Sequence, residues 1–148
     1  MPLTGEEEPN PVPWVREQIE AYRASGGREA NTLRETGIPI ILVTSRGRRS
    51  GKLRTFALMR VEHDGEYSLV VSKGGAPEHP AWYHNLVAAP TEVMIQDGAE
   101  PFDVEVREVD GAEREAWWTR SVAVYPPYAE YQTNTDRLIP VLVARRKG

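Results

Sequence analysis

The chain has 148 residues, no cysteine, 40% hydrophobic and 27% charged residues, and a formal net charge of −4. This composition is typical of one globular domain in a reducing cytoplasm, and it excludes disulfides, thiolate nucleophiles and sulfur-ligated metals. The acidic balance also argues against a nucleic-acid partner recognised through the overall field of the protein. We therefore expect a cytoplasmic protein with a single domain over residues 1–148.

The N-terminal region has no basic head followed by an apolar run, so no secretory signal is expected. Residues 1–11 hold three prolines and an acidic run, which predicts a flexible acidic arm. A helix is predicted over residues 12–25, where apolar residues recur near helical spacing before Gly26-Gly27. No apolar stretch approaches membrane-spanning length, so we expect no stable membrane insertion and leave peripheral association open.

Strand patterns dominate the next part of the chain. A β-branched apolar run at 38–44 predicts one strand, and a second is expected at about 54–62. Asp64-Gly65 then predicts a tight hairpin turn, because both central residues of a type I′ turn need positive φ. A third strand over 66–72 would complete a meander.

Helices and strands alternate in the remainder. A short helix is predicted near residues 79–90, followed by strands at 91–96 and 102–109 that join at Asp97-Gly98. A helix after Gly111 and a last strand at 138–144 complete the pattern, which favours an antiparallel barrel with covering helices over 38–144.

The segment between the first two strands is strongly basic. Residues 46–54, called the basic turn below, hold five Arg or Lys residues and no acid. Guanidinium groups, glycine N–H groups and nearby hydroxyls suit a phosphate, although such a turn can also be a solvated loop. The spacing of Gly47 and Gly51, with Leu53 in place of Ser or Thr, excludes a Walker loop.

Three further motifs have a functional and an ordinary interpretation. Ser72-Lys73-Gly74-Gly75 is a strand end that could add a cation beside the basic turn. The two histidines of residues 79–85 are poorly spaced for a metal, so no metal site is expected and a packed helix is the alternative. Tyr125, Tyr128 and Tyr131 form one aromatic edge, either a surface lid or the wall of a substrate pocket.

The order and spacing of five segments resemble the deazaflavin-dependent nitroreductase family of actinobacteria. They are residues 44–55, 72–76, 79–86, 125–131 and 136–140. The resemblance implies an α+β, mainly β fold, a split antiparallel β-barrel like that of flavin-binding pyridoxamine-phosphate oxidases. It also implies coenzyme F-420, an 8-hydroxy-5-deazaflavin with a phosphate and a polyglutamate tail.

The resemblance assigns residues to three parts of a site. The acidic end of the coenzyme would be held by Arg48, Arg49, Ser50, Arg54, Thr55 and Lys73. The deazaflavin would be lined by Leu58, Met59, Val70, Val71 and Ser72, with Ala81, Trp82, Tyr83, His84 and Asn85 beside it and Tyr128 near the ring. Phe56 and Ala57 are further residues of the predicted coenzyme site. The accompanying proton would come from Tyr125, Tyr128, Tyr131 or water.

The predicted activity is hydride transfer from the reduced coenzyme to a small electron-poor acceptor, namely a quinone, an α,β-unsaturated lactone or a nitroaromatic. The protein would supply orientation and fixed charge, while the coenzyme carries the chemistry. Two alternatives stay open, a non-catalytic deazaflavin-binding or storage protein and an FMN-dependent split-barrel oxidase. The oligomeric state is expected to be a monomer or a weak dimer.

Overall fold

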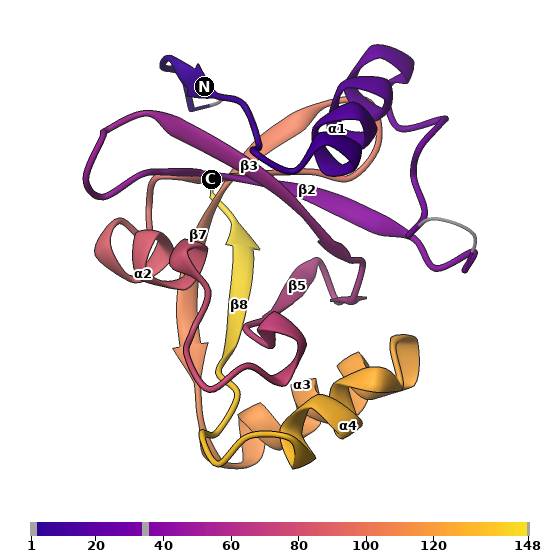
Figure 1. Cartoon of the computed structure of the whole chain (residues 1–148), viewed down its shortest axis with the longest axis vertical. Coiled ribbons are helices and arrows are strands. Elements are labelled where there is room, and N and C mark those ends of the chain that lie inside the picture. Colours follow the sequence, from indigo (N-terminus) through magenta and orange to yellow (C-terminus); the bar gives the residue numbers. More distant parts are fainter. Residues whose placement is uncertain (1–2, 34–35, 148) are drawn as a thin grey trace.

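The computed structural model describes residues 3–33 and 36–147 of the chain (Figure 1). Its strands are Glu7–Glu8 (β1), Ile40–Arg46 (β2), Leu53–Met59 (β3), Glu62–His63 (β4), Glu66–Val70 (β5), Val93–Gln96 (β6), Pro101–Val109 (β7) and Val141–Arg146 (β8). Its helices are Pro13–Ser25 (α1), the 3-10 turn Lys73–Gly75 (η1), Ala81–Ala88 (α2), Gly111–Val124 (α3) and Pro127–Thr133 (α4).

The strands form one sheet in the order β1-β3-β2-β6-β7-β8-β5-β4, antiparallel except for the β1–β3 pair. The chain passes from β3, near one end of this order, to β4 at the other end through Arg60 and buried Val61. The sheet therefore curls back on itself, and this confirms the predicted split barrel. Among the described residues it has eight strands where six were predicted, because the two-residue strands β1 and β4 carry too little pattern to be recognised.

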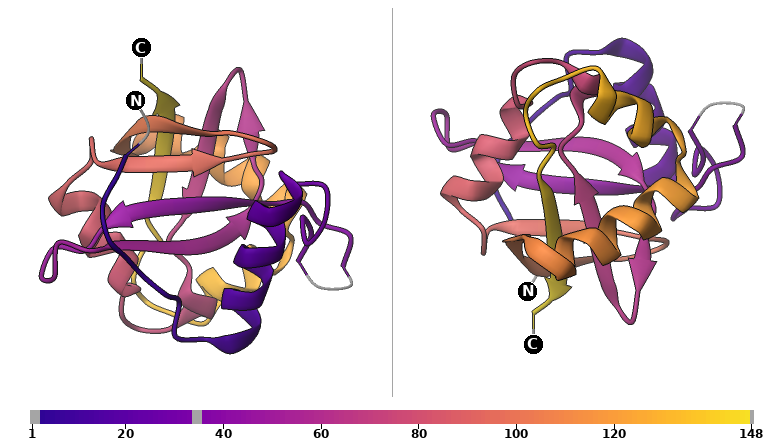
Figure 2. Two further views of the ribbon diagram at one scale, coloured as in Figure 1. Left: turned by 90° about the horizontal axis from the view of Figure 1, so that it is seen from above. Right: turned by 90° about the horizontal axis from the view of Figure 1, so that it is seen from below.

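The strand β2 is buried on both faces, because its alternate side chains enter two different cores. Ile41 and Val43 belong to the main cluster inside the barrel. Ile40 and Leu42 pack instead against Ile19 and the neighbouring apolar residues of α1. Helix α1 therefore covers the outer face of β2 and β3, while α3 and α4 gather beside the end of the barrel formed by β5 and β8 (Figure 2).

The structure corrects the predicted meander. The Asp64-Gly65 turn joins β4 to β5 with positive φ at both residues, as predicted. However, β5 pairs with β8 and lies at the opposite end of the sheet order from β3. A similar adjustment applies to Asp97-Gly98, which lies in a loop of four residues between Gln96 and Pro101 rather than a two-residue turn.

The described residues of the acidic N-terminal arm, which was predicted to be flexible, pair with the sheet. Strand β1 pairs in parallel with the start of β3, with Glu7 opposite Leu53. The Leu3 N–H donates to Asp103 Oδ1 at 2.7 Å, and the Lys147 N–H donates to the Asp103 carbonyl at 3.0 Å. Both described ends of the chain are thus held on the same residue of β7.

Candidate functional site: a cationic cleft and a tyrosine cluster

The basic turn is closed by its own backbone. The Gly47 N–H donates to the Lys52 carbonyl at 2.7 Å, and the Gly51 N–H donates to the Gly47 carbonyl at 2.9 Å. Ser50 Oγ accepts a further hydrogen bond from the Lys52 N–H. Because these bonds occupy the backbone, the cationic side chains are presented from a fixed loop.

A cleft with a volume of about 440 Å³ lies between the basic turn and α2. Its lining contains the exposed side chains of Arg48 and Arg49 and the partly exposed Arg54. Within the part of the chain that the structure describes, no carboxylate pairs with Arg48 or Arg49. Two guanidinium groups without a carboxylate partner among the described residues are able to accept an anion, and bidentate phosphate contacts suit this donor set.

Helix α2 forms the other wall of the cleft and anchors the turn. Asn85 is mostly buried, and its Oδ1 accepts a hydrogen bond of 3.1 Å from the Arg48 N–H. One turn earlier, Trp82 stacks on Phe56 of β3, with ring centroids 4.6 Å apart and planes 20° from parallel. These contacts couple the position of α2 to the position of the cationic side chains.

The three tyrosines form a second cluster. The Tyr125 and Tyr131 hydroxyls lie 3.2 Å apart, and buried Tyr128 packs edge to face on Tyr125 at 5.0 Å between centroids. The hydrogen bond with Tyr125, together with burial, raises the pKa of Tyr131 to about 12, and burial raises the pKa of Tyr128 as well. Both of these phenols keep their protons near neutral pH, because their pKa values are raised above the ordinary tyrosine value of about 10.

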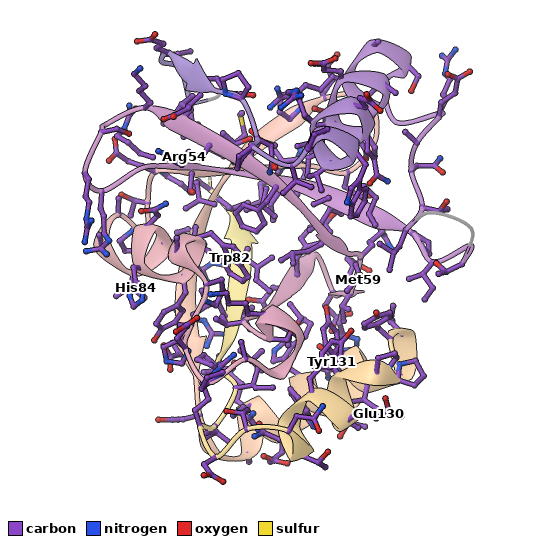
Figure 3. All side chains as sticks on the ribbon, in the orientation of Figure 1. Arg54, Met59, Trp82, His84, Glu130 and Tyr131 are labelled. Carbon is purple, nitrogen blue, oxygen red and sulfur yellow. The ribbon has the colours of Figure 1, made fainter. Side chains whose placement is uncertain are left out.

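Strand β3 connects the two clusters. Figure 3 shows Arg54 and Met59 at opposite ends of this strand, with Trp82 and His84 below Arg54 and Tyr131 below Met59. Met59 packs against the buried cluster of Val70, Tyr128 and Ile139, against which Tyr125 and Tyr131 also pack. At about 3.4 Å per residue, the five steps from Arg54 to Met59 span roughly 17 Å. The cationic cleft and the tyrosine cluster therefore lie near opposite ends of β3.

Most of the residues predicted to bind the acidic end come together at the cleft. The cleft is lined by Gly47, Arg48, Arg49, Ser50, Arg54, Ala81, His84 and Asn85. The Thr55 hydroxyl is instead buried on the opposite side of β3, where it bonds Thr44 Oγ1 at 2.8 Å. Lys73 pairs with Glu78 at 3.0 Å on η1 and does not line the cleft.

The predicted ring-lining residues are divided by the alternation of the strands. Phe56, Leu58, Trp82 and Tyr83 pack on the main core cluster, of which Val71 is a buried member. Ala57 faces the opposite side of β3 and packs against α1. Ser72 leads into η1, and its carbonyl accepts a hydrogen bond from Arg137. The structure thus distributes the predicted coenzyme-binding residues over β3, β5, the segment leading into η1, α2 and α4 rather than in one pocket.

Two contacts near the site were not predicted from the sequence. Arg137 donates hydrogen bonds to the carbonyls of Val71, Ser72 and Ala76 and lies 3.0 Å from His79 Nδ1, so it fixes the segment around η1. The acidic N-terminal segment reaches the basic turn, where Glu8 pairs with Arg54 at 2.8 Å. Both are contacts between distant parts of the sequence.

The described residues were also compared with the requirements of a metal site and of a membrane-spanning helix. Among residues 3–33 and 36–147, no group of three or more His, Asp or Glu side chains is placed to hold a metal ion. No helix in the described ranges is long and apolar enough to cross a membrane.

Comparison with known proteins identifies the family. Residues 14–146 match the model of the F420H(2)-dependent quinone reductases. An F420H(2)-dependent quinone reductase of Mycobacterium tuberculosis (strain ATCC 25618 / H37Rv) is 33% identical over 129 residues, covering 85% of each chain.

Two solved structures are also similar. One, described as an F420-H2 dependent reductase, is 56% identical with a TM-score of 0.68, covering 72% of this chain and 94% of the other. A second, described as a domain-swapped dimer, is 50% identical with a TM-score of 0.71, covering 92% and 100%. These relationships confirm the predicted resemblance to deazaflavin-dependent reductases, with coenzyme F-420 as the redox partner. The chain belongs to the F420H(2)-dependent quinone reductase family.

Proposed function

We propose that this protein is a reductase that uses reduced coenzyme F-420 to reduce a quinone. The observation that carries the proposal is the cleft beside the basic turn, where Arg48 and Arg49 have no carboxylate partner among the described residues. Such a donor set fits the phosphate and glutamate groups of this coenzyme. A neutral quinone carries no charge that these two arginines could bind.

The chain supplies different functions at the two ends of β3. At the basic turn, Arg48, Arg49 and Arg54 would hold the acidic end of the coenzyme, and Ser50 would add a hydroxyl donor. At the other end, Met59 and the tyrosine cluster would limit the space for the ring and the acceptor. Fixing both ends of an elongated ligand orients its reactive part, which lowers the entropic cost of reaction.

The reaction also needs one proton. The reduced deazaflavin supplies a hydride, and a quinone that accepts it becomes a hydroquinone anion that takes up one proton. Tyr125 or Tyr131, or a water held by them, would donate a hydrogen bond to the developing oxyanion. The raised pKa of Tyr131 keeps this donor protonated at neutral pH.

The range of acceptors that the protein reduces is proposed to extend beyond quinones. The relatives are named for quinones, and α,β-unsaturated lactones and nitroaromatics share the electron-poor, flat character that the tyrosine cluster could accommodate. Oxidation of the reduced coenzyme, followed with one acceptor of each class, would rank them. Absence of turnover with all three classes would favour a storage protein.

The binding proposal is tested by fluorescence titration with oxidised F-420 and, in parallel, with FMN. Arg48→Ala and Arg54→Ala remove cleft guanidinium groups, and Arg28→Ala removes an exposed guanidinium outside the cleft as the control. A charge-assisted hydrogen bond contributes about 1.5–3 kcal/mol, so each cleft variant should raise the Kd roughly tenfold or more. Equal affinity for F-420 and FMN, or equal loss in all variants, would contradict the assignment and favour an FMN oxidase.

Three broader expectations stay predictions. A single domain is supported by the continuous sheet that includes β1 and β8. A cytoplasmic location is supported by the absence of cysteine. A monomer or weak dimer can be checked by light scattering, and one solved relative is described as a domain-swapped dimer.

A further inference from the structure

The acidic N-terminal segment, residues Glu6–Glu8, lies along the first residues of β3 and the basic turn. The Leu53 N–H donates to the Glu6 carbonyl at 2.8 Å, which seats the segment on the edge of the sheet. Glu8 Oε2 then lies 2.8 Å from Arg54 Nη2, and Glu6 Oε1 lies 3.8 Å from Lys52 Nζ. Figure 1 shows this N-terminal strand beside β3.

The contact is part of a continuous attachment. Before the acidic segment, the Thr4 carbonyl accepts a hydrogen bond from Arg46 Nη2. After it, Asn10 Nδ2 donates to the Thr55 carbonyl at 3.0 Å. Within the segment, Glu7 pairs with Arg23 of α1 at 2.8 Å. Glu8 is therefore held near Arg54 by contacts of the chain on both sides of it.

Arg54 thus differs from the other two cleft arginines. All three line the cleft, but the guanidinium of Arg54 is already paired with a carboxylate of the chain itself. A phosphate or carboxylate that approaches Arg54 meets the negative charge of Glu8 at the same group. Like charges at one cation repel, and only one of them can take the best donor geometry.

We propose that Glu8 is a specificity-determining residue, which competes with the acidic end of the coenzyme for Arg54 and so limits the affinity for strongly anionic tails. The inference rests on the proposed function of the same cleft. Glu8 would thereby lower the affinity of the chain for its coenzyme at Arg54, whereas Arg48 and Arg49 would bind the coenzyme without a competing carboxylate among the described residues.

The expected size of the effect follows from the exposure of the pair. The Arg54 and Glu8 side chains are 43% and 42% exposed, so solvent screens their attraction. Exposed ion pairs are weak, and removing the competitor should strengthen coenzyme binding about two- to fivefold at low salt. The gain should shrink as salt increases, because the charges are accessible to ions.

The experiment compares Glu8→Gln with Glu17→Gln in the full-length chain. Glu17 is exposed on α1, so its variant makes the same change in net charge away from the turn. Two ligands are titrated by fluorescence, namely the complete coenzyme and the deazaflavin chromophore without phosphate or glutamates. Glu8→Gln should tighten binding of the complete coenzyme and leave binding of the tail-free chromophore unchanged. Glu17→Gln should change the affinity for either ligand by less than Glu8→Gln changes the affinity for the complete coenzyme.

A double-variant cycle isolates the pair. In an Arg54→Ala background, Glu8→Gln should no longer tighten binding, because the shared cation is gone. Unchanged or weaker coenzyme binding by Glu8→Gln, an equal gain for the tail-free chromophore, or a gain that persists without Arg54 would each overturn the inference while leaving the proposed function intact. Failure of every variant and of the unmodified chain to bind the coenzyme would overturn both. Circular dichroism spectra establish that the compared variants are folded.

Discussion

Replacing Asn85 with Ala should weaken coenzyme binding without touching a charged group. The change removes the acceptor of the Arg48 N–H, a hydrogen bond of 3.1 Å whose acceptor residue is 8% exposed. A hydrogen bond of this kind contributes about 0.5–1.5 kcal/mol net. If that energy orients the basic turn for its ligand, the Kd for oxidised F-420 should rise roughly twofold to tenfold.

The assay is fluorescence titration of three variants alongside the unmodified protein. Asn31→Ala is the control, because the Asn31 side chain also bonds the backbone, with its Nδ2 donating to the Gly27 carbonyl, but lies outside the cleft. Asn85→Asp keeps the acceptor and adds a negative charge at the anion site, so it should weaken binding more than Asn85→Ala does. Unaltered affinity in Asn85→Ala, or tighter binding in Asn85→Asp, would refute the anchoring role of this residue.

Three other predictions follow from single contacts. A Cβ on Gly75, at φ +83°, would lie 2.7 Å from the Tyr131 carbonyl oxygen, whereas a Cβ on Gly65, at φ +82°, would meet open space. In urea denaturation, Gly75→Ala should therefore lower the free energy of unfolding by about 1–3 kcal/mol more than Gly65→Ala does. Burial lowers the pKa of His79 below 6.5, so at acidic pH the unfolded chain binds more protons at this residue than the folded chain does. The free energy of unfolding should therefore fall as the pH drops below about 6.5, and His79→Gln should reduce that loss in denaturation measured as a function of pH. Tyr125→Phe should lower the pKa of Tyr131 in ultraviolet difference titration, and an unchanged value would contradict the hydrogen-bond assignment.

Local sequence patterns predicted the elements well where the signal is local. The helix at 12–25 matches α1 to within one residue, because its apolar spacing and its Gly26 stop are adjacent in the chain. The turn at Asp64-Gly65 is set by the backbone freedom of those two residues. The partner of each strand was harder to predict. Strand β5 pairs with β8 rather than with β3, and this pairing joins residues far apart in the sequence, such as Leu69 and Leu142.

The candidate site was predicted in part for the same reason. The cationic character of the cleft lies in one continuous segment, so Arg48, Arg49 and Arg54 were identified directly. The prediction could not separate Thr55 from its neighbours, since the side to which it points depends on the burial of β3 between two layers. Nor could it connect Glu8 with Arg54, which are 46 positions apart.

The sequence by itself determined the charge of the basic turn, the apolar strands and the family to which the chain belongs. These properties depend on residue identity and short spacing, which folding does not change. Only the tertiary structure decided which cations remain available to a ligand, because pairing depends on what the fold brings near them. Strand β1 places Glu8 on Arg54 and leaves Arg48 and Arg49 without such a partner among the described residues. A basic segment thereby becomes a cleft whose three arginines are not equivalent.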